Sequence, residues 1–171
     1  MKINYLKING YKNLKSKAIF ADINTCTNYL ALIGLNGSGK SNVLEAVSII
    51  FACLFNKSKT AFSYEIKYDI NNFEVSVLDG KMSVKDQKIL KNEIDNYLPQ
   101  EIIACYSGED RRLWDDIYKE FYFDFFDSIL KKKASIFPKL LYVNRYCWEI
   151  ALISLLCSGR KTLYSPLSSV S

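Results

Sequence analysis

The spacing of hydrophobic and polar residues predicts strands at the start of the chain. Lys2–Asn9 and residues 18–23 are β-branched or aromatic runs, separated by a polar stretch that begins at Gly10. This pattern is typical of two strands that pair with each other. Residues 29–33 are continuously apolar and end at Gly34. A continuous apolar run predicts a strand that is buried on both faces, at the centre of a sheet.

The hydrophobic period changes to that of a helix over Lys40–Phe55. Apolar side chains recur there at helical spacing, and two more widen the stripe: Val43, Val47, Ile50 and Leu54, with Leu44 and Phe51. A stripe of this kind predicts an amphipathic helix. An apolar strand, a glycine-rich segment and a helix are therefore expected to follow one another without a gap.

A β-hairpin is predicted in the middle of the chain. Phe73–Leu78 and residues 81–85 alternate in polarity and are joined by Asp79-Gly80. An Asp-Gly pair favours a type I′ turn, because both central residues of that turn need a positive φ. Residues 61–70 predict a further strand of the same group.

The remaining segments are predicted to be mainly helical. Residues 86–98, with apolar side chains at four-residue spacing and Pro99 after them, predict a helix. Residues 101–106 predict a short strand, and residues 144–158 an apolar helix. Residues 109–133 predict a long helix with a wide aromatic face. Such a face is typical of packing against a core or further chain, and a base-stacking platform is the alternative.

Composition and charge narrow the class of protein. The 171 residues suffice for one ordinary globular core. The net charge of +5 is mild. The longest basic run is the three lysines 131–133, which is typical of the solvated end of a helix, with a nucleic-acid contact as the alternative. The chain has no histidine, and its five cysteines show no C-x-x-C spacing, which argues against a zinc site. Because the apolar stretches are short and no secretory signal is visible, we expect a cytoplasmic protein with no membrane association.

The chemistry of the chain is concentrated in one glycine-rich segment. It reads Gly34, Leu35, Asn36, Gly37, Ser38, Gly39, Lys40, Ser41 and fits the phosphate-loop pattern G-x-x-x-x-G-K-[ST]. Glycines remove side chains that would hold the backbone away from a polyphosphate, and they permit positive φ angles that turn N–H groups inward. The helix that starts near Lys40 adds the partial positive charge of its N-terminus.

The ligands follow from the same segment. Lys40 is predicted to reach the β and γ phosphates of ATP, and Ser41 to place its hydroxyl on Mg²⁺. We therefore predict ATP and Mg²⁺ as the bound cofactors, held by residues 34–41 together with Asn42.

The sequence around this loop resembles a known family. Residues 32–47, with Asn42 directly after Ser41, are similar to the start of SMC/RecF-type ATPases, ABC-like members of the AAA family that include the OLD nucleases and bacterial defence ATPases. Residues 8–16 resemble the aromatic and basic turn that precedes the phosphate loop in that family. The hairpin after the first helix is similar to the family's antiparallel β-subdomain.

The resemblance implies an α/β P-loop NTPase fold. The expected architecture is the first lobe of an ABC-like ATPase, an incomplete domain with a mixed sheet, an antiparallel β-subdomain and flanking helices. Residues 1–164 would form this lobe, and residues 165–171 a disordered tail. Residues 102–109 resemble the strand and loop where ABC-like enzymes place their Q-loop, but they contain no glutamine. Ser107 and Glu109 are candidates to assist Mg²⁺ or water, although a turn capped by Ser107 explains the same residues.

Two motifs that the resemblance implies are missing from the sequence. A Walker B strand ends in Asp-Glu, which hold Mg²⁺ and orient the attacking water. Asp115-Asp116 follows a segment of helical pattern instead of a strand. Cys157-Ser158-Gly159-Arg160 resembles the signature motif only weakly. In the family a partner subunit presents that signature motif, so the active unit is a dimer.

These observations predict an ATP-binding N-terminal portion of an SMC/RecF-type ATPase that does not hydrolyse ATP alone. It would act as a homodimer or with the missing C-terminal half. DNA repair or phage defence, with DNA as a partner, follows by analogy with the family. The alternatives are a non-catalytic, nucleotide-responsive binding module and an ATPase of another P-loop class, such as a transporter.

Overall fold

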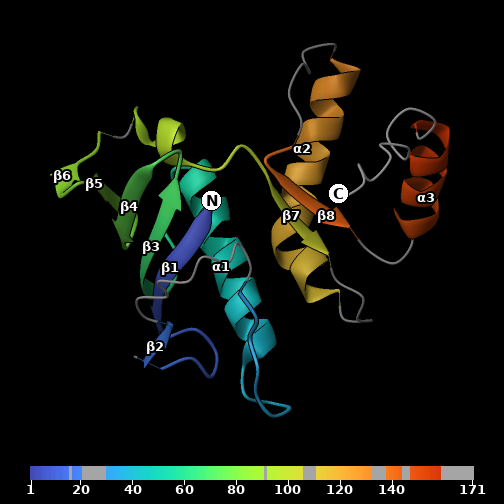
Figure 1. Cartoon of the computed structure of the whole chain (residues 1–171). Coiled ribbons are helices and arrows are strands. Elements are labelled where there is room, and N and C mark those ends of the chain that lie inside the picture. The colour runs from blue at the N-terminus through green and yellow to red at the C-terminus, as the bar shows by residue number, and fades with distance from the viewer. Residues whose placement is uncertain are drawn as a thin grey trace, which may run out of the picture. The chain divides into compact units, whose positions relative to one another are not determined.

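The computed structural model describes seven segments of the chain: residues 1–15, 17–20, 30–90, 92–105, 111–131, 138–143 and 147–158 (Figure 1). The chain divides into two compact units. The first comprises Met1–Glu101 with Ser135–Lys139, and the second comprises Ile102–Ala134 with Leu140–Ser171. Each unit has its own sheet.

Six antiparallel strands form the sheet of the first unit, in the order β2-β1-β3-β4-β5-β6. Their bounds are β1 (Lys2–Asn9), β2 (Lys17–Phe20), β3 (Ser63–Ile70), β4 (Phe73–Leu78), β5 (Lys81–Val84) and β6 (Gln87–Lys88). β1 pairs with β2 on one side and, along its whole length, with β3 on the other. The predicted pairing of the first two strands is therefore confirmed, and so is the strand before the hairpin.

Two-residue turns with positive φ join the strands of the meander. Asp79 (φ 46°) and Gly80 (φ 80°) connect β4 to β5, which confirms the predicted type I′ hairpin. Residues 71–72 and residues 85–86 also have positive φ and make the turns on either side of this hairpin. The positive φ at Lys85 and Asp86 reverses the chain into β6, where a helix had been expected to begin.

The predicted helix over residues 86–98 is therefore wrong in most of its length. Only the short 3-10 helix η1 (Ile94–Tyr97) is helical. Ile94 and Leu98 are buried, but Leu90, the first residue of the expected stripe, is 64% exposed. Two apolar residues four apart also fit one tight turn followed by extended chain, so their spacing alone did not determine a helix.

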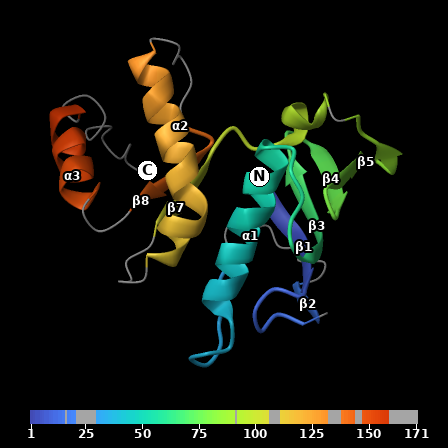
Figure 2. The same cartoon turned by 180° about the vertical axis from the view of Figure 1, so that it is seen from behind.

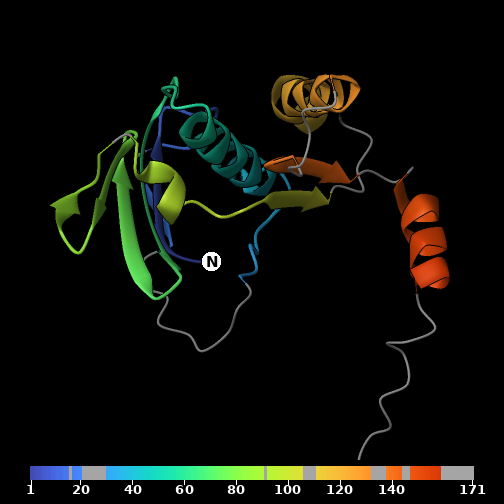
Figure 3. The same cartoon turned by 90° about the horizontal axis from the view of Figure 1, so that it is seen from above.

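Helix α1 (Lys40–Phe55) has the bounds that the sequence predicts, and it lies along one face of the sheet (Figure 3). Its buried face supplies Val43, Ala46, Ile50, Phe51, Leu54 and Phe55. The Phe51 ring lies 5.7 Å from the ring of Tyr68 on β3. The Tyr68 hydroxyl donates to the Tyr97 carbonyl at 2.9 Å, and burial raises the pKa of Tyr68. The core of this unit therefore lies between α1 and β1, β3 and β4.

The apolar run before the phosphate loop does not form the predicted central strand. Residues 30–33, the described part of that run, have no regular secondary structure, and the Ile33 side chain is 95% exposed. In the part of the chain that the structure describes, no strand pairs with this run. A strand needs a neighbour for its backbone hydrogen bonds, so hydrophobicity alone cannot produce one here.

The second unit contains a parallel pair of strands and two helices. β7 (Ile102–Cys105) pairs with β8 (Leu140–Val143), and α2 (Lys119–Leu130) lies against this pair (Figure 2). A π-helical turn, η2 (Trp114–Tyr118), leads into α2. The Trp114 and Tyr118 rings lie 6.0 and 5.5 Å from Tyr142 of β8, so the first part of the predicted aromatic face packs on this sheet. α3 (Cys147–Ser158) confirms the described part of the predicted C-terminal helix.

Both strand directions are present, but they are separated between the units. The first sheet is entirely antiparallel and the second is a parallel pair, where a mixed sheet and an antiparallel β-subdomain were expected. Among the described residues, no helix combines the length and apolar character that crossing a bilayer requires. The tail predicted at residues 165–171 lies outside the described residues.

Candidate phosphate-binding site

Two of the three loop glycines have the predicted left-handed backbone. Gly37 has φ 81° and Gly39 has φ 95°, and the Ser38 N–H between them donates to the Leu35 carbonyl at 3.2 Å. Gly34 was expected to share this conformation but does not. A Cβ at Gly34 would lie 2.8 Å from the Ser38 hydroxyl oxygen. A rotation of the Ser38 side chain would relieve that contact, so the backbone angles require glycine at Gly37 and Gly39 but not at Gly34.

The loop leads directly into the N-terminus of α1. Gly39 is the N-cap residue, and the first helical hydrogen bond runs from the Val43 N–H to the Gly39 carbonyl at 3.0 Å. The N–H groups of Lys40, Ser41 and Asn42 lie in the first turn of α1 and have no hydrogen-bond acceptor within the helix. No side chain caps this end, and no acidic residue occupies the first turn. These N–H groups and the helix dipole together favour an anion at this position.

The Lys40 side chain folds back across the loop. Its ammonium donates to the carbonyls of Gly34 and Leu35, each at 2.7 Å. An ammonium has three N–H donors, so one remains for an oxygen of a ligand. This geometry fits the predicted contact with a phosphate group.

Ser41 follows Lys40 on the first turn of α1, and its side chain is exposed. Among the described residues, no cluster of three or more His, Cys, Asp or Glu could hold a metal ion. Ser41 is the described residue that the motif predicts as a Mg²⁺ ligand, and a hydroxyl oxygen is a ligand type that this ion accepts together with phosphate oxygens and water.

A turn between β1 and β2 contacts the phosphate loop. We call residues 10–14 the β1–β2 turn; it is closed by the Leu14 N–H, which donates to the Tyr11 carbonyl at 2.8 Å. The Asn13 side-chain amide donates to the Gly37 carbonyl at 3.2 Å, and its oxygen accepts from the Asn42 amide at 2.7 Å. Asn13 thus contacts both the loop and the first turn of α1, and the sequence did not predict it as a site residue.

The buried carboxylate of Glu45 on α1 binds two side chains of the β1–β2 turn. The Glu45 side chain is buried, accepts from the Tyr11 hydroxyl at 3.1 Å and forms an ion pair with Lys12. The hydrogen bond to Glu45 raises the pKa of Lys12. Burial, followed by the hydrogen bond to Glu45, raises the pKa of Tyr11, whose ring packs on Phe62 at 4.9 Å. The turn is therefore fixed to α1 one helical turn beyond Ser41.

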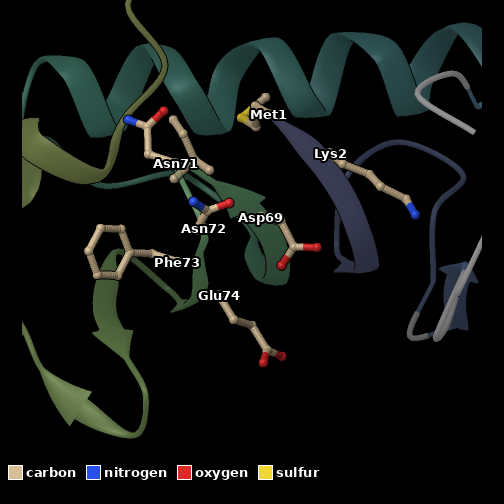
Figure 4. Close-up of a pocket in the computed structure, with 8 residues that line it drawn as sticks. Met1, Lys2, Asp69, Asn71, Asn72, Phe73 and Glu74 are labelled. Atoms are coloured by element: carbon tan, nitrogen blue, oxygen red, sulfur yellow. The ribbon is translucent and has the colours of Figure 1, made fainter. Parts of the chain in front are cut away.

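The hollow drawn in Figure 4 is a different place on the same unit. It measures about 590 Å³ and is lined by residues 1–2 and 69–74, none of which belongs to the phosphate loop. Asp69 and Glu74 face each other across β3 and β4. Lys2 lines the hollow as well, so its lining carries both signs of charge, and it includes none of the glycines of the phosphate-loop motif.

Two further segments of the sequence carry residues that were considered for the site, 107–109 and 115–116. Ser107 and Glu109 lie outside the described residues. Asp115 and Asp116 lie in the π-helical turn η2, which confirms that they do not end a strand. Asp115 instead forms an exposed ion pair with Arg111 at 3.6 Å.

Comparison with known proteins places the chain in a family. No curated protein matches it. A family model described as "AAA ATPase domain" matches residues 1–156, which include the phosphate loop and both sheets. This match supports a P-loop NTPase fold that binds ATP, and proteins of this kind generally use Mg²⁺ with the nucleotide. With the match and the loop geometry in agreement, the chain belongs to the AAA ATPase domain family.

Proposed function

We propose that the chain is the ATP-binding N-terminal portion of an SMC/RecF-type ATPase and does not hydrolyse ATP alone. The observation that carries the proposal is the phosphate loop at the N-terminus of α1. Its left-handed glycines, its uncapped helix N–H groups and the Lys40 ammonium all suit a polyphosphate. The branch within the family rests on the resemblance of residues 32–47, with Asn42 directly after Ser41.

The ends of the two parallel strands support the proposed lack of hydrolysis. β8 has the apolar character of a Walker B strand and pairs in parallel with β7. It is followed in sequence by Asn144-Arg145, and β7 by Tyr106-Ser107, where a hydrolytic enzyme needs Asp-Glu. An amide or a guanidinium cannot replace a carboxylate that orients an attacking water.

Exposed apolar side chains support association with further protein. Ile33 and Leu35 are exposed beside the loop, and several apolar residues of α3 are exposed as well: Ile150, Leu152, Ile153 and Leu156. Large apolar side chains that are exposed to this extent are typical of surfaces that another protein covers. We propose that a second copy of the chain or a separate C-terminal half covers these residues.

The test measures binding and turnover on the same purified chain. We expect Mg-ATP to bind and Lys40→Ala to weaken binding about 10- to 100-fold, because the variant loses charge-assisted hydrogen bonds. Phosphate release should stay at background. Turnover at ordinary ATPase rates, abolished by Lys40→Ala, would contradict the proposed lack of hydrolysis.

A nucleotide-responsive binding module is a second candidate, favoured by the same exposed apolar residues. In that case Mg-ATP would change the molecular mass in solution, or binding to a partner, without turnover. A role in DNA repair or phage defence is proposed from the family resemblance. It predicts DNA binding that weakens steeply as salt is added, measured with the chain and its partner together.

A further inference from the structure

The β1–β2 turn contacts the phosphate loop through the side chain of Asn13. We propose that Asn13 is a positioning residue of the nucleotide site, which sets the orientation of the Gly37–Ser38 peptide. This inference rests on the proposed binding of a polyphosphate at residues 34–41. It assigns a role to a residue outside the phosphate-loop motif.

The orientation follows from the geometry of one peptide group. The Asn13 amide donates to the Gly37 carbonyl at 3.2 Å. A trans peptide is planar, so the Gly37 carbonyl and the Ser38 N–H point in opposite directions. Holding the carbonyl toward Asn13 therefore turns the Ser38 N–H toward the interior of the loop. The Ser38 N–H indeed donates to the Leu35 carbonyl, which also accepts from the Lys40 ammonium.

The loop needs such a restraint because of its own composition. Gly37 and Gly39 lie on either side of Ser38, and both have positive φ. Glycine populates many backbone conformations at similar free energy, so the peptide groups between two glycines can rotate. A rotated Gly37–Ser38 peptide would break the hydrogen bond from the Ser38 N–H to the Leu35 carbonyl and turn the Gly37 carbonyl oxygen into the loop, where it would repel a phosphate. A hydrogen bond from outside the loop disfavours that arrangement.

Asn13 is itself held in one orientation. The Asn42 amide donates to the Asn13 oxygen at 2.7 Å, which leaves the Asn13 amide nitrogen to face Gly37. The backbone of Gly39 packs against the same side chain, since a Cβ at Gly39 would lie 2.8 Å from the Asn13 oxygen. Glu45 holds the turn to α1 through Tyr11 and Lys12. Asn42 therefore acts on the loop through Asn13.

The experiment compares Asn13→Ala, Asn42→Ala and the double variant with the unchanged chain. Binding of Mg-ATP and of Mg-pyrophosphate is measured by competition with a fluorescent nucleotide, and the melting temperature of each variant is recorded. Pyrophosphate offers the loop its phosphates and nothing else. Asn96→Ala is the matched control, because Asn96 is exposed and lies on η1, away from the loop in sequence.

We expect Asn13→Ala to weaken both ligands to the same extent, by about fivefold to tenfold, as the loss of one restraining hydrogen bond predicts. The double variant should bind like Asn13→Ala alone, because Asn42 acts through Asn13. Melting temperatures should stay close to that of the unchanged chain, and Asn96→Ala should bind normally.

The other outcomes overturn the inference in distinguishable ways. If Asn13→Ala binds both ligands as tightly as the unchanged chain, the positioning role is wrong and the nucleotide site stands. If the binding losses of Asn13→Ala and Asn42→Ala add in the double variant, and the variants also melt at a lower temperature, Asn13 only stabilises the fold. If the unchanged chain binds neither ligand, the proposed function fails together with this inference.

Discussion

The ion pair between Lys12 and Glu45 joins an exposed cation to a buried anion. Their side chains are 36% and 5% exposed, respectively. Removing the cation leaves a charge in the protein interior, whereas removing the anion leaves a charge that water can reach. We therefore predict that Lys12→Met destabilises the protein more than Glu45→Gln does.

The magnitudes follow from this difference in exposure. Breaking a buried pair by removing one partner typically costs about 3–5 kcal/mol of unfolding free energy. Because Lys12 is partly exposed, water screens part of its attraction to Glu45. We therefore expect Lys12→Met to lower the unfolding free energy by about 2–3 kcal/mol. Glu45→Gln keeps an acceptor for the Tyr11 hydroxyl and should cost about 1 kcal/mol.

The assay is urea unfolding followed by circular dichroism, applied to both single variants and to the double variant. The double variant should be close to Glu45→Gln alone, because neutralising the buried partner removes the penalty of losing Lys12. Lys57→Met is the matched control, since the Lys57–Asp95 pair is exposed on both sides (42% and 45%) and should cost at most about 1 kcal/mol. A Glu45→Gln variant less stable than Lys12→Met would refute the reasoning.

Three further predictions concern the loop, the core and an exposed carboxylate. Gly39→Ala should weaken Mg-ATP binding and lower the unfolding free energy by about 1–3 kcal/mol, measured by titration and urea unfolding, because alanine is strained at φ 95° and crowds Asn13. Tyr68→Phe should cost about 1–2 kcal/mol in urea unfolding, because the Tyr97 carbonyl loses its donor. The hydrogen bond from Lys57 holds the pKa of Asp95 below its ordinary value of 3.8. The stability that Asp95 contributes is therefore present above pH 3.8 and is lost as the pH falls through the lowered pKa. Asp95→Asn should therefore be slightly less stable than the unchanged chain at pH 6 and equal to it near pH 2, by the same unfolding assay.

Local sequence patterns were sufficient to predict α1 and the Asp79-Gly80 turn, but they did not show which strands pair with each other over long distances in the sequence. α1 and the Asp79-Gly80 turn depend on spacings within a few residues, and the sequence predicted both correctly. The apolar run at residues 30–33 needed a pairing strand, which its own composition cannot supply. β8 (Leu140–Val143) was not predicted, because a four-residue apolar run cannot be distinguished from part of a helix by periodicity.

The same distinction separates the parts of the site. The loop residues lie next to one another in sequence, so one motif identifies them. The contacts of Asn13 with Gly37 and Asn42 span 24 and 29 residues, and no local spacing encodes them. One signal was visible: Glu45 places a charge within the apolar stretch of α1, and a charge on a buried helix face requires a partner elsewhere in the chain.

Nucleotide binding requires a loop backbone that is both accessible and held in one conformation, and different residues meet these two requirements. Binding a polyphosphate needs glycines that leave the backbone accessible, but those glycines also leave it free to adopt conformations that bind nothing. Hydrogen bonds within the loop, from Ser38 and Lys40, supply part of the restraint. Asn13, Asn42 and Glu45 are placed to add to it from outside the loop. The motif alone consequently accounts for which ligand the chain binds. How tightly it binds depends in addition on a turn more than 20 residues earlier in the sequence.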